Sequence, residues 1–238
     1  MASFVISGGG NTACGETKVF DYEIIRLSGK GAPHVLFICL ASRDPEKTYS
    51  SLKKIYCDGY GCSTDHLSLE DIKDPFAARS KIDRADIIYV SGGYTAMLMR
   101  RLRRFGTDRL LAEAAKQDKV LCGCSAGAIC WCRYGQTKTP SGGSERVAGL
   151  GLLNLLFCPH IVTQPFRADA VKKIMKKTYQ TAAVDLDMSA IEIKGDKYRI
   201  LRLDKNVKAE KNYWKKGVYY TEDILSPEWK DLSELYSK

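Results

Sequence analysis

The sequence predicts an α/β fold with a mostly parallel central sheet, helices on both faces of that sheet, and a small antiparallel hairpin. Apolar runs of strand length alternate with amphipathic helical segments, which is the pattern of β-α-β crossovers. Several runs end in glycine-rich turns, and a Gly-Asp turn separates two later β-rich runs. The 238 residues can bury a large core, and we predict a single domain over residues 1–238.

The first half of the chain follows this alternation. The run 34–41 is apolar throughout, as in a strand covered on both faces, and Pro45 marks the start of a helix. The predicted strands are Phe4–Ser7, His34–Ala41, Cys62–Leu67, Asp86–Val90 and Lys119–Cys124. The predicted helices are Val19–Leu27, Pro45–Cys57, Thr95–Phe105, Thr107–Gln117 and Ala126–Tyr134.

The pattern changes after Tyr134. The residues that follow predict a polar loop, a strand, a basic helix and the two strands of a hairpin, at Gly135–Glu145, Leu155–Pro159, Ala168–Tyr179, Ala190–Ile193 and Tyr198–Leu203. The tail mixes aromatic and charged residues from Lys211 onwards. We expect residues 204–238 to form a C-terminal extension that docks on the edge of the sheet.

The charge composition points to a soluble protein with a basic surface. Lys and Arg number 37 and Asp and Glu 28, a net charge of +9. No run of about 18 apolar residues and no basic, apolar leader is present, so we predict a cytoplasmic protein without a membrane segment. Because the clusters 100–104 and 172–177 lie on amphipathic helical patterns, we interpret them as solvated helix faces. Attraction of anionic substrates is the alternative, and nucleic-acid binding is disfavoured.

The cysteine content indicates free thiols. Nine cysteines, an odd number without an export signal, are typical of a reducing compartment. Their close pairs lack C-x-x-C spacing, and only three histidines are available to complete a metal site. We therefore predict no metal and interpret the thiols as small buried apolar groups.

A nucleophile elbow is predicted at Gly123-Cys124-Ser125-Ala126-Gly127. This segment fits G-x-S-x-G, with a strand-like run before it and a helical run after it. Small neighbours permit the sharp turn that exposes the serine hydroxyl at the end of the strand. The backbone N–H of Ala126 could then stabilise an oxyanion. The alternative is an ordinary tight turn without a chemical role.

A second glycine turn, Ser91-Gly92-Gly93-Tyr94-Thr95, also joins a strand to a helix. The N–H of Gly93 is the candidate for a second oxyanion donor, and a phosphate loop or an ordinary turn is the alternative. No Gly-Lys-Ser or Gly-Lys-Thr follows, which excludes a Walker loop. The turn at residues 8–10 lacks G-x-G-x-x-G spacing, so we predict no cofactor.

His160 is the candidate base. It follows an apolar strand, at the edge where the active-site groups of parallel sheets gather. By contrast, His34 opens a buried strand and His66 lies in a polar one. A base needs an orienting carboxylate. The acidic residues downstream are Asp185, Asp187 and Glu192.

Five sequence blocks together resemble the aspartyl dipeptidase (dipeptidase E) family of serine peptidases, in particular its Gram-positive-type branch. They span Phe4 to about Leu203: SGGG at 7–10, SGG-x-T at 91–95, G-x-SAGAICW at 123–131, GLGLL at 149–153 and FCPH at 157–160. The resemblance implies a class I glutamine-amidotransferase-like α/β fold and a triad in the order Ser-His-Glu. α/β-Hydrolases order their triad Ser…Asp/Glu…His, and no histidine follows His160 here.

The resemblance implies a role for each candidate in the triad. Ser125 corresponds to the nucleophile, His160 to the base and Asp187 to the acid, where the family usually has Glu. Asp185, two residues away on the same strand face, is the alternative acid.

The resemblance also suggests how substrate is bound. Arg167 is the candidate for the family's substrate arginine, since a guanidinium binds both oxygens of a carboxylate. Gly92 and Thr95 are expected to line the substrate site. The aspartate that family members often carry after the elbow helix is absent from Thr137–Gly143, which weakens the implied aspartyl specificity.

We therefore predict a cofactor-independent serine peptidase that hydrolyses small peptides, in particular dipeptides with an N-terminal Asp. One alternative is a hydrolase of another amide, such as an isoaspartyl or cell-wall peptide. A second is a catalytically inactive binding protein of the same family. The predicted partner is a small peptide, with neither nucleic acid nor membrane, and a homodimer is left open.

Overall fold

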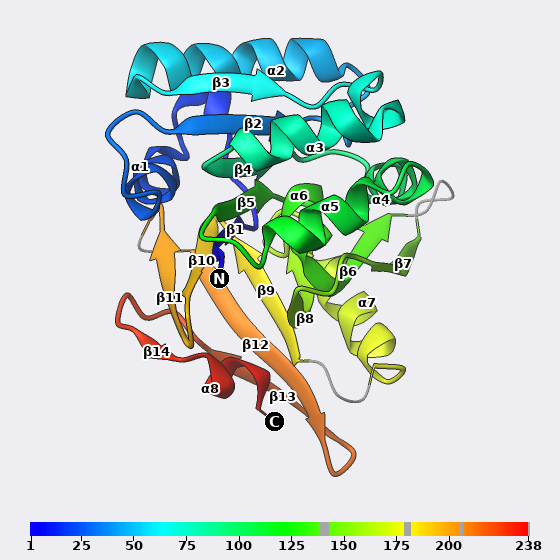
Figure 1. Ribbon diagram of the computed structural model, residues 1–238. Coiled ribbons are helices and arrows are strands. Elements are labelled where there is room, and N and C mark those ends of the chain that lie inside the picture. The colour runs from blue at the N-terminus through cyan, green and yellow to red at the C-terminus, as the bar shows by residue number, and fades with distance from the viewer. Residues whose placement is uncertain (139–142, 179–181, 205–206, 238) are drawn as a thin grey trace.

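The computed structural model describes residues 1–138, 143–178, 182–204 and 207–237, and its strands form two sheets (Figure 1). Within these residues the first sheet has eight strands in the order β14-β11-β10-β1-β5-β4-β2-β3. Their bounds are β1 Ser3–Ser7, β2 His34–Ile38, β3 Ser63–His66, β4 Ile87–Val90, β5 Val120–Cys124, β10 Ser189–Lys194, β11 Lys197–Arg202 and β14 Lys230–Asp231. Strands β1 to β5 pair in parallel, as predicted, and β10, β11 and β14 are antiparallel to their neighbours.

A second sheet, which the sequence did not predict, has six strands among the described residues, in the order β13-β12-β9-β8-β6-β7. Their bounds are β6 Cys132–Lys138, β7 Ser144–Ala148, β8 Leu153–Pro159, β9 Ala182–Asp187, β12 Lys208–Lys215 and β13 Val218–Asp223. Pairing is parallel for β6–β8 and β8–β9 and antiparallel elsewhere. A mostly parallel sheet with one hairpin is therefore an incomplete description of this fold.

The observed second half of the chain first differs from the predicted one at the elbow helix. We predicted this helix over Ala126–Tyr134, but α6 ends at Trp131 and the chain continues directly as β6. The predicted polar loop Gly135–Glu145 contains the end of β6 and the start of β7, and its residues 139–142 lie outside the described part. Most side chains of β7 are solvent-exposed, so this strand lacks the apolar alternation from which a strand is predicted.

The helices cover the sheets on several sides (Figure 1). Their bounds are α1 Lys18–Leu27, α2 Pro45–Lys54, α3 Pro75–Arg84, α4 Thr95–Arg104, α5 Thr107–Ala114, α6 Ala126–Trp131, α7 Phe166–Met175 and α8 Leu232–Tyr236. Residues of α1 and α2 pack with one face of the first sheet, and residues of α3 to α6 with the other. Helix α7 packs on the second sheet, and the predicted end of this helix at Tyr179 lies outside the described residues.

Helix α3 was not predicted, although it begins with a clear cap. Oδ1 of Asp74 accepts a hydrogen bond of 2.9 Å from the N–H of Phe76, and Pro75 occupies the first helical position. The buried side chains of this helix are Ala78 and Ile82, so its apolar periodicity is weak.

The main core contains side chains of both sheets and of helices α3 to α6. Strand β8 shows how it is divided: Leu155 and Phe157 belong to the main core, while Leu156 and Cys158 belong to the smaller cluster with α7. Alternate side chains of a strand point to opposite faces, so β8 is buried on both sides. This double burial holds the residue that follows β8, His160, in a defined place.

The predicted hairpin is present as β10 and β11, and β10 pairs with β1 and so extends the first sheet. In the predicted C-terminal extension, β14 pairs with β11 at the edge of that sheet. Strand β12, by contrast, pairs with β9 and extends the second sheet.

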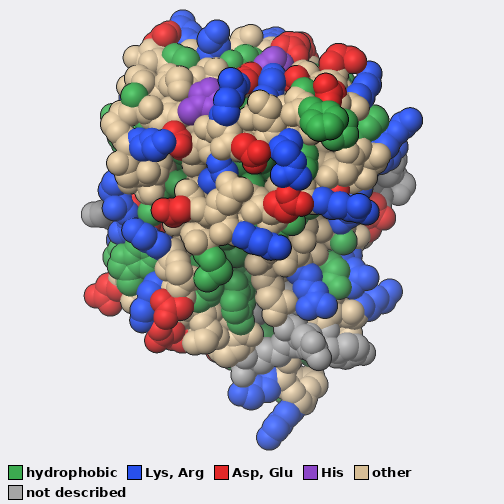
Figure 2. Space-filling model, in the orientation of Figure 1, with side chains coloured by type: hydrophobic (Ala, Val, Ile, Leu, Met, Phe, Trp, Pro, Cys, Tyr) green, Lys and Arg blue, Asp and Glu red, His purple; other side chains and the backbone are tan. Residues whose placement is uncertain are grey.

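The basic residues do not form one continuous patch on the face shown in Figure 2, where Lys and Arg side chains are interspersed with Asp and Glu. Helix α4 follows the amphipathic interpretation, since its buried side chains are Thr95, Leu98, Met99 and Leu102. None of the helices in the described part of the chain has the length and apolar character needed to span a bilayer.

Candidate active site

Ser125 lies in the sharp turn between β5 and α6. Its φ of 53° and ψ of −110° are unusual for a residue with a side chain. A Cβ on Gly127 would lie 1.9 Å from the carbonyl oxygen of Val90, and a Cβ on Gly123 would lie 2.7 Å from the same atom. Both positions therefore require glycine, and the G-x-S-x-G spacing has a steric cause in this fold.

His160 brings its ring to Ser125. Its Nε2 lies 2.9 Å from Oγ of Ser125. His160 directly follows β8, has a φ of 64°, and donates its backbone N–H to the carbonyl oxygen of Leu186 on β9 at 3.2 Å. A hydroxyl and an imidazole at hydrogen-bond distance have the geometry that general-base activation needs.

Asp187 ends β9 and is buried, with 4% of its surface exposed. A Cβ placed on Gly9 would lie 3.6 Å both from Oδ1 of Asp187 and from Nδ1 of His160. The carboxylate and the imidazole therefore border the same narrow gap beside the glycine-rich turn that follows β1. The next residue, Met188, has a φ of 53° and leads the chain into β10.

Backbone strain is concentrated around these residues. Among the described residues other than glycine, four have a positive φ, and three of them are Ser125, His160 and Met188. Each such conformation costs of order 1–3 kcal/mol, so the surrounding packing must hold it in place. Strain of this kind is common where side chains are positioned for chemistry.

Asp185, the alternative acid, has different surroundings. Its Oδ2 accepts a hydrogen bond of 2.9 Å from Nδ2 of Asn212, and it pairs in register with Cys158 of β8. Burial, reinforced by the charge of Glu210, raises the pKa of Asp185 to about 8. Of the two aspartates, Asp187 is the one found beside the imidazole of His160.

The second glycine turn approaches Ser125 closely. A Cβ on Gly92 would lie 3.5 Å from the Cβ of Ser125. Gly93 has a φ of 142°, and a Cβ there would lie 2.2 Å from the carbonyl oxygen of Ala41. Gly93 and Thr95 line the same cavity as Ser125. The backbone of Gly93 thus lies near the serine on one side, and that of Ala126 follows it directly in the chain.

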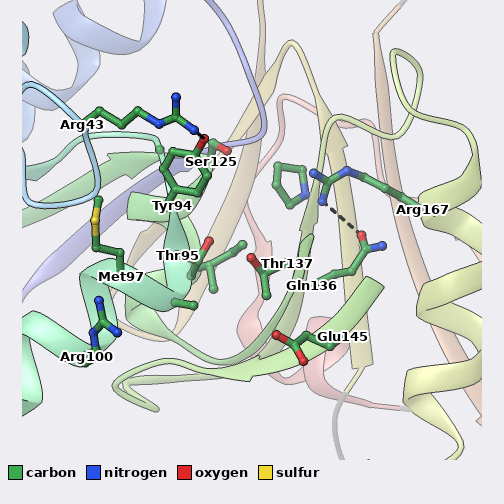
Figure 3. A pocket seen from close by; sticks show the side chains of 14 residues that line it. Arg43, Tyr94, Thr95, Met97, Arg100, Ser125, Gln136, Thr137, Glu145 and Arg167 are labelled. Carbon is green, nitrogen blue, oxygen red and sulfur yellow. Dashed lines mark hydrogen bonds between the residues drawn. The ribbon is translucent and has the colours of Figure 1, made fainter. Parts of the chain in front are cut away.

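The cavity in front of Ser125 has a volume of about 880 Å³. Figure 3 shows Arg43 and Tyr94 on one wall and Arg167 and Gln136 on the opposite wall. Three arginines and one carboxylate are among the lining residues, which favours an anionic ligand. The charged lining residues are Arg43, Arg100, Arg167 and Glu145.

Arg167 is a buried cation, with 6% of its surface exposed. Its Nη1 donates to Oε1 of Gln136 at 3.1 Å and its Nε to Oε1 of Gln164 at 3.0 Å. Burial lowers the pKa of Arg167, but a guanidinium starts so high that it remains charged at neutral pH. Both of these partners are neutral, so the charge is available to a ligand in the cavity.

Sequence reasoning did not identify Arg43, Gln136 or Glu145 as cavity residues. Arg43 lies in a polar turn before α2, and the other two lie in the stretch interpreted as a loop. No local pattern distinguishes them from solvated side chains. Their common feature, a position on the wall of one cavity, arises only from the tertiary structure, which brings the turn after β2 near β6 and β7.

The thiol beside Ser125 is disfavoured as a nucleophile. All nine are free thiols, and burial raises the pKa of Cys124, the neighbour of Ser125, which disfavours the reactive thiolate. In the described ranges, no group of three or more His, Cys, Asp or Glu side chains is arranged to hold a metal ion.

Comparison with known proteins identifies the family. Residues 3–201 match Peptidase family S51. The uncharacterized peptidase YgaJ of Bacillus subtilis (strain 168) is 30% identical over 186 residues, which cover 78% of this chain and 79% of that protein. The uncharacterized peptidase Lin0382 of Listeria innocua is 35% identical over 112 residues, covering 44% of this chain and 51% of that one.

Solved structures share the fold. A peptidase from an acI-B1 Actinobacterium superposes with a TM-score of 0.68 at 20% identity, covering 97% of each chain. A candidate peptidase E protein from Listeria monocytogenes EGD-e superposes with a TM-score of 0.64 at 22% identity, covering 86% of this chain and all of that one. The resemblance stated from five sequence blocks is confirmed: this chain belongs to peptidase family S51, the dipeptidase E family of serine-type peptidases.

Proposed function

We propose that this protein hydrolyses small peptides, in particular dipeptides with an N-terminal aspartate, through a Ser125-His160-Asp187 triad. The observation that carries the proposal is the 2.9 Å contact between Nε2 of His160 and Oγ of Ser125 at the wall of the large cavity. Membership of a serine-type peptidase family supports the same reaction class.

In the proposed reaction, Oγ of Ser125 attacks the scissile carbonyl carbon while Nε2 of His160 takes the hydroxyl proton. The N–H groups of Gly93 and Ala126 stabilise the oxyanion of the tetrahedral intermediate. His160 then passes the proton to the leaving amine, and the C–N bond breaks to leave an ester on Ser125. Water, deprotonated by His160, then attacks the carbonyl carbon of this ester. The bond between that carbon and Oγ breaks, His160 returns the proton to Oγ of Ser125, and the acid product leaves.

Asp187 and Arg167 have separate roles in this proposal. Asp187 orients the imidazole and stabilises its protonated form, which is supported by its position beside Nδ1 of His160. Arg167 binds a carboxylate of the substrate, which is supported by its burial and its neutral partners. Together they favour cleavage next to an acidic residue.

A fluorophosphonate probe tests the proposal at its central residue. The folded protein should acquire one covalent adduct, located on Ser125 by mass spectrometry of its peptides, because the probe reacts with activated serines. The S125A variant and heat-denatured protein should remain unlabelled. An unlabelled native protein, under conditions that label a known serine hydrolase, would argue against an activated Ser125.

Exchange of Arg167 for methionine tests substrate recognition. R167M should lower kcat/KM for Asp-Leu about 10- to 100-fold, because charge-assisted hydrogen bonds contribute about 1.5–3 kcal/mol. Hydrolysis of Asn-Leu should change much less, since this substrate lacks the side-chain carboxylate that we assign to Arg167. R133M is the matched control, because Arg133 is exposed and lies outside the cavity lining. Equal losses on both dipeptides would contradict the assignment.

A further inference from the structure

The guanidinium of Arg167 is hydrogen-bonded to one end of a row of buried polar side chains on the second sheet. The row consists of Gln136, Cys158, Asp185 and Asn212. Oε1 of Gln136 accepts from Nη1 of Arg167 at 3.1 Å and from Sγ of Cys158 at 3.2 Å. Nε2 of Gln136 donates to Oγ of Ser144 at 2.8 Å. These contacts fix the orientation of the amide, with its oxygen towards Arg167 and the thiol.

The row continues from Cys158 across the sheet. Cys158 of β8 pairs in register with Asp185 of β9, whose Oδ2 accepts from Asn212 of β12 at 2.9 Å. Oδ1 of Asn212 accepts from Oγ1 of Thr221 on β13 at 2.7 Å. Asp185 of β9 is thus a buried acid, two strands from Gln136 of β6 on the cavity wall, and connected to that wall by side chains.

The hydrogen-bonding capacity of the Asp185 carboxylate is only partly satisfied. It is 2% exposed, and its Oδ1 has no hydrogen-bond partner among the described atoms. A buried carboxylate with an unpaired oxygen is costly, whereas the protonated carboxyl is tolerated. Asp185 has no role in the proposed hydrolytic steps.

The charged and titratable groups around Asp185 are mostly acidic. Cys158 faces it from β8, Glu210 from β12 and Tyr219 from β13, while α7 contributes Arg167 at the other end of the row. Burial, with the charge of Glu210, raises the pKa of Asp185 to about 8. At neutral pH, therefore, the side chains of the row are neutral, and Arg167 at its end carries the charge.

We propose that Asp185 is a positioning residue for substrate recognition, which acts through Cys158 and Gln136 on the guanidinium of Arg167. The inference rests on the proposed function, because Arg167 is taken as the group that binds the substrate carboxylate. While Asp185 is protonated, the positive charge of Arg167 faces the cavity without an internal counter-charge. Once Asp185 ionises, its negative charge offsets that of Arg167 and weakens the binding of an anionic ligand.

Calorimetric titration with succinate tests this without relying on hydrolysis. Succinate carries two carboxylates and no amine, and its charge is constant between pH 7 and 9.5. For the wild-type protein, we expect Kd to rise about tenfold over this range, the equivalent of roughly one unit of linked pKa change. The D185N variant keeps an oxygen for Asn212 and stays uncharged, so its Kd should vary less than about twofold.

The E210Q variant provides a second test if D185N fails to fold. Glu210 is partly exposed and pairs with Lys208, so its exchange should be tolerated. Because its negative charge raises the pKa of Asp185, its removal should move the rise in Kd to lower pH. An unshifted rise in E210Q, a wild-type-like rise in D185N, or no binding of succinate by the wild type would each overturn the inference. Loss of the proposed function would appear separately, as an absence of Ser125-dependent dipeptide hydrolysis.

Discussion

The S125A variant is expected to hydrolyse Asp-Leu with a kcat that is lower than that of the wild type by a factor of about 10⁴ or more. Removal of Oγ removes the atom that forms the acyl-enzyme, and only binding and oxyanion stabilisation remain to assist water. The KM should change little, because Ser125 forms one small part of the cavity wall. Product formation followed by chromatography over several hours measures rates this low.

The neighbouring thiol provides the control for this variant. Cys124 lies one residue before Ser125, and burial raises its pKa. C124A should therefore keep kcat within about threefold, a change of about 0.7 kcal/mol or less. Wild-type activity in S125A, or loss of activity in C124A alone, would show that the elbow serine is not the nucleophile.

The D187N variant is expected to lower kcat about 10³- to 10⁴-fold. A neutral amide cannot stabilise the imidazolium of His160, and its NH₂ group can favour the unproductive tautomer. The effect should be on kcat, with KM nearly unchanged, because Asp187 is absent from the cavity lining. Steady-state kinetics over a range of Asp-Leu concentrations separates kcat from KM.

Two companion variants make the test of Asp187 specific. D187E should recover part of the activity, since it restores the charge and supplies the acid usual in the family. D196N removes the same charge from the exposed turn between β10 and β11 and should behave as the wild type. A D187N enzyme with wild-type kcat would assign the orienting role to another group.

The parallel half of the fold could be predicted because its signals are local. Each of the five predicted strands of the first half appears in the first sheet, and the elbow residues occupy the expected strand-to-helix turn. Gly123 and Gly127 explain this success, since a side chain at either position would collide with the backbone carbonyl oxygen of Val90. Sequence alone therefore determined the serine, the turn that presents it, and the family.

The second sheet could not be predicted, because local sequence patterns do not show which of its segments form strands and pair with one another. Strand β7 has mostly exposed side chains and is a strand because it pairs with β6, while β12 and β9 pair across more than twenty residues. β-Structure of this kind reflects packing on neighbouring strands more than local preference.

The same reason separates what the sequence by itself determined about the site from what tertiary structure decided. The motifs named Ser125 and favoured His160, but two aspartates on one strand face remained open as partner. Only the assembled sheets distinguish them: the chain turns at Met188 and brings Asp187 beside Gly9 and His160, while the pairing of β9 with β8 and β12 encloses Asp185. A carboxylate's role depends on its neighbours in space, and these neighbours come from β1, β8 and β12, which are far apart in the chain.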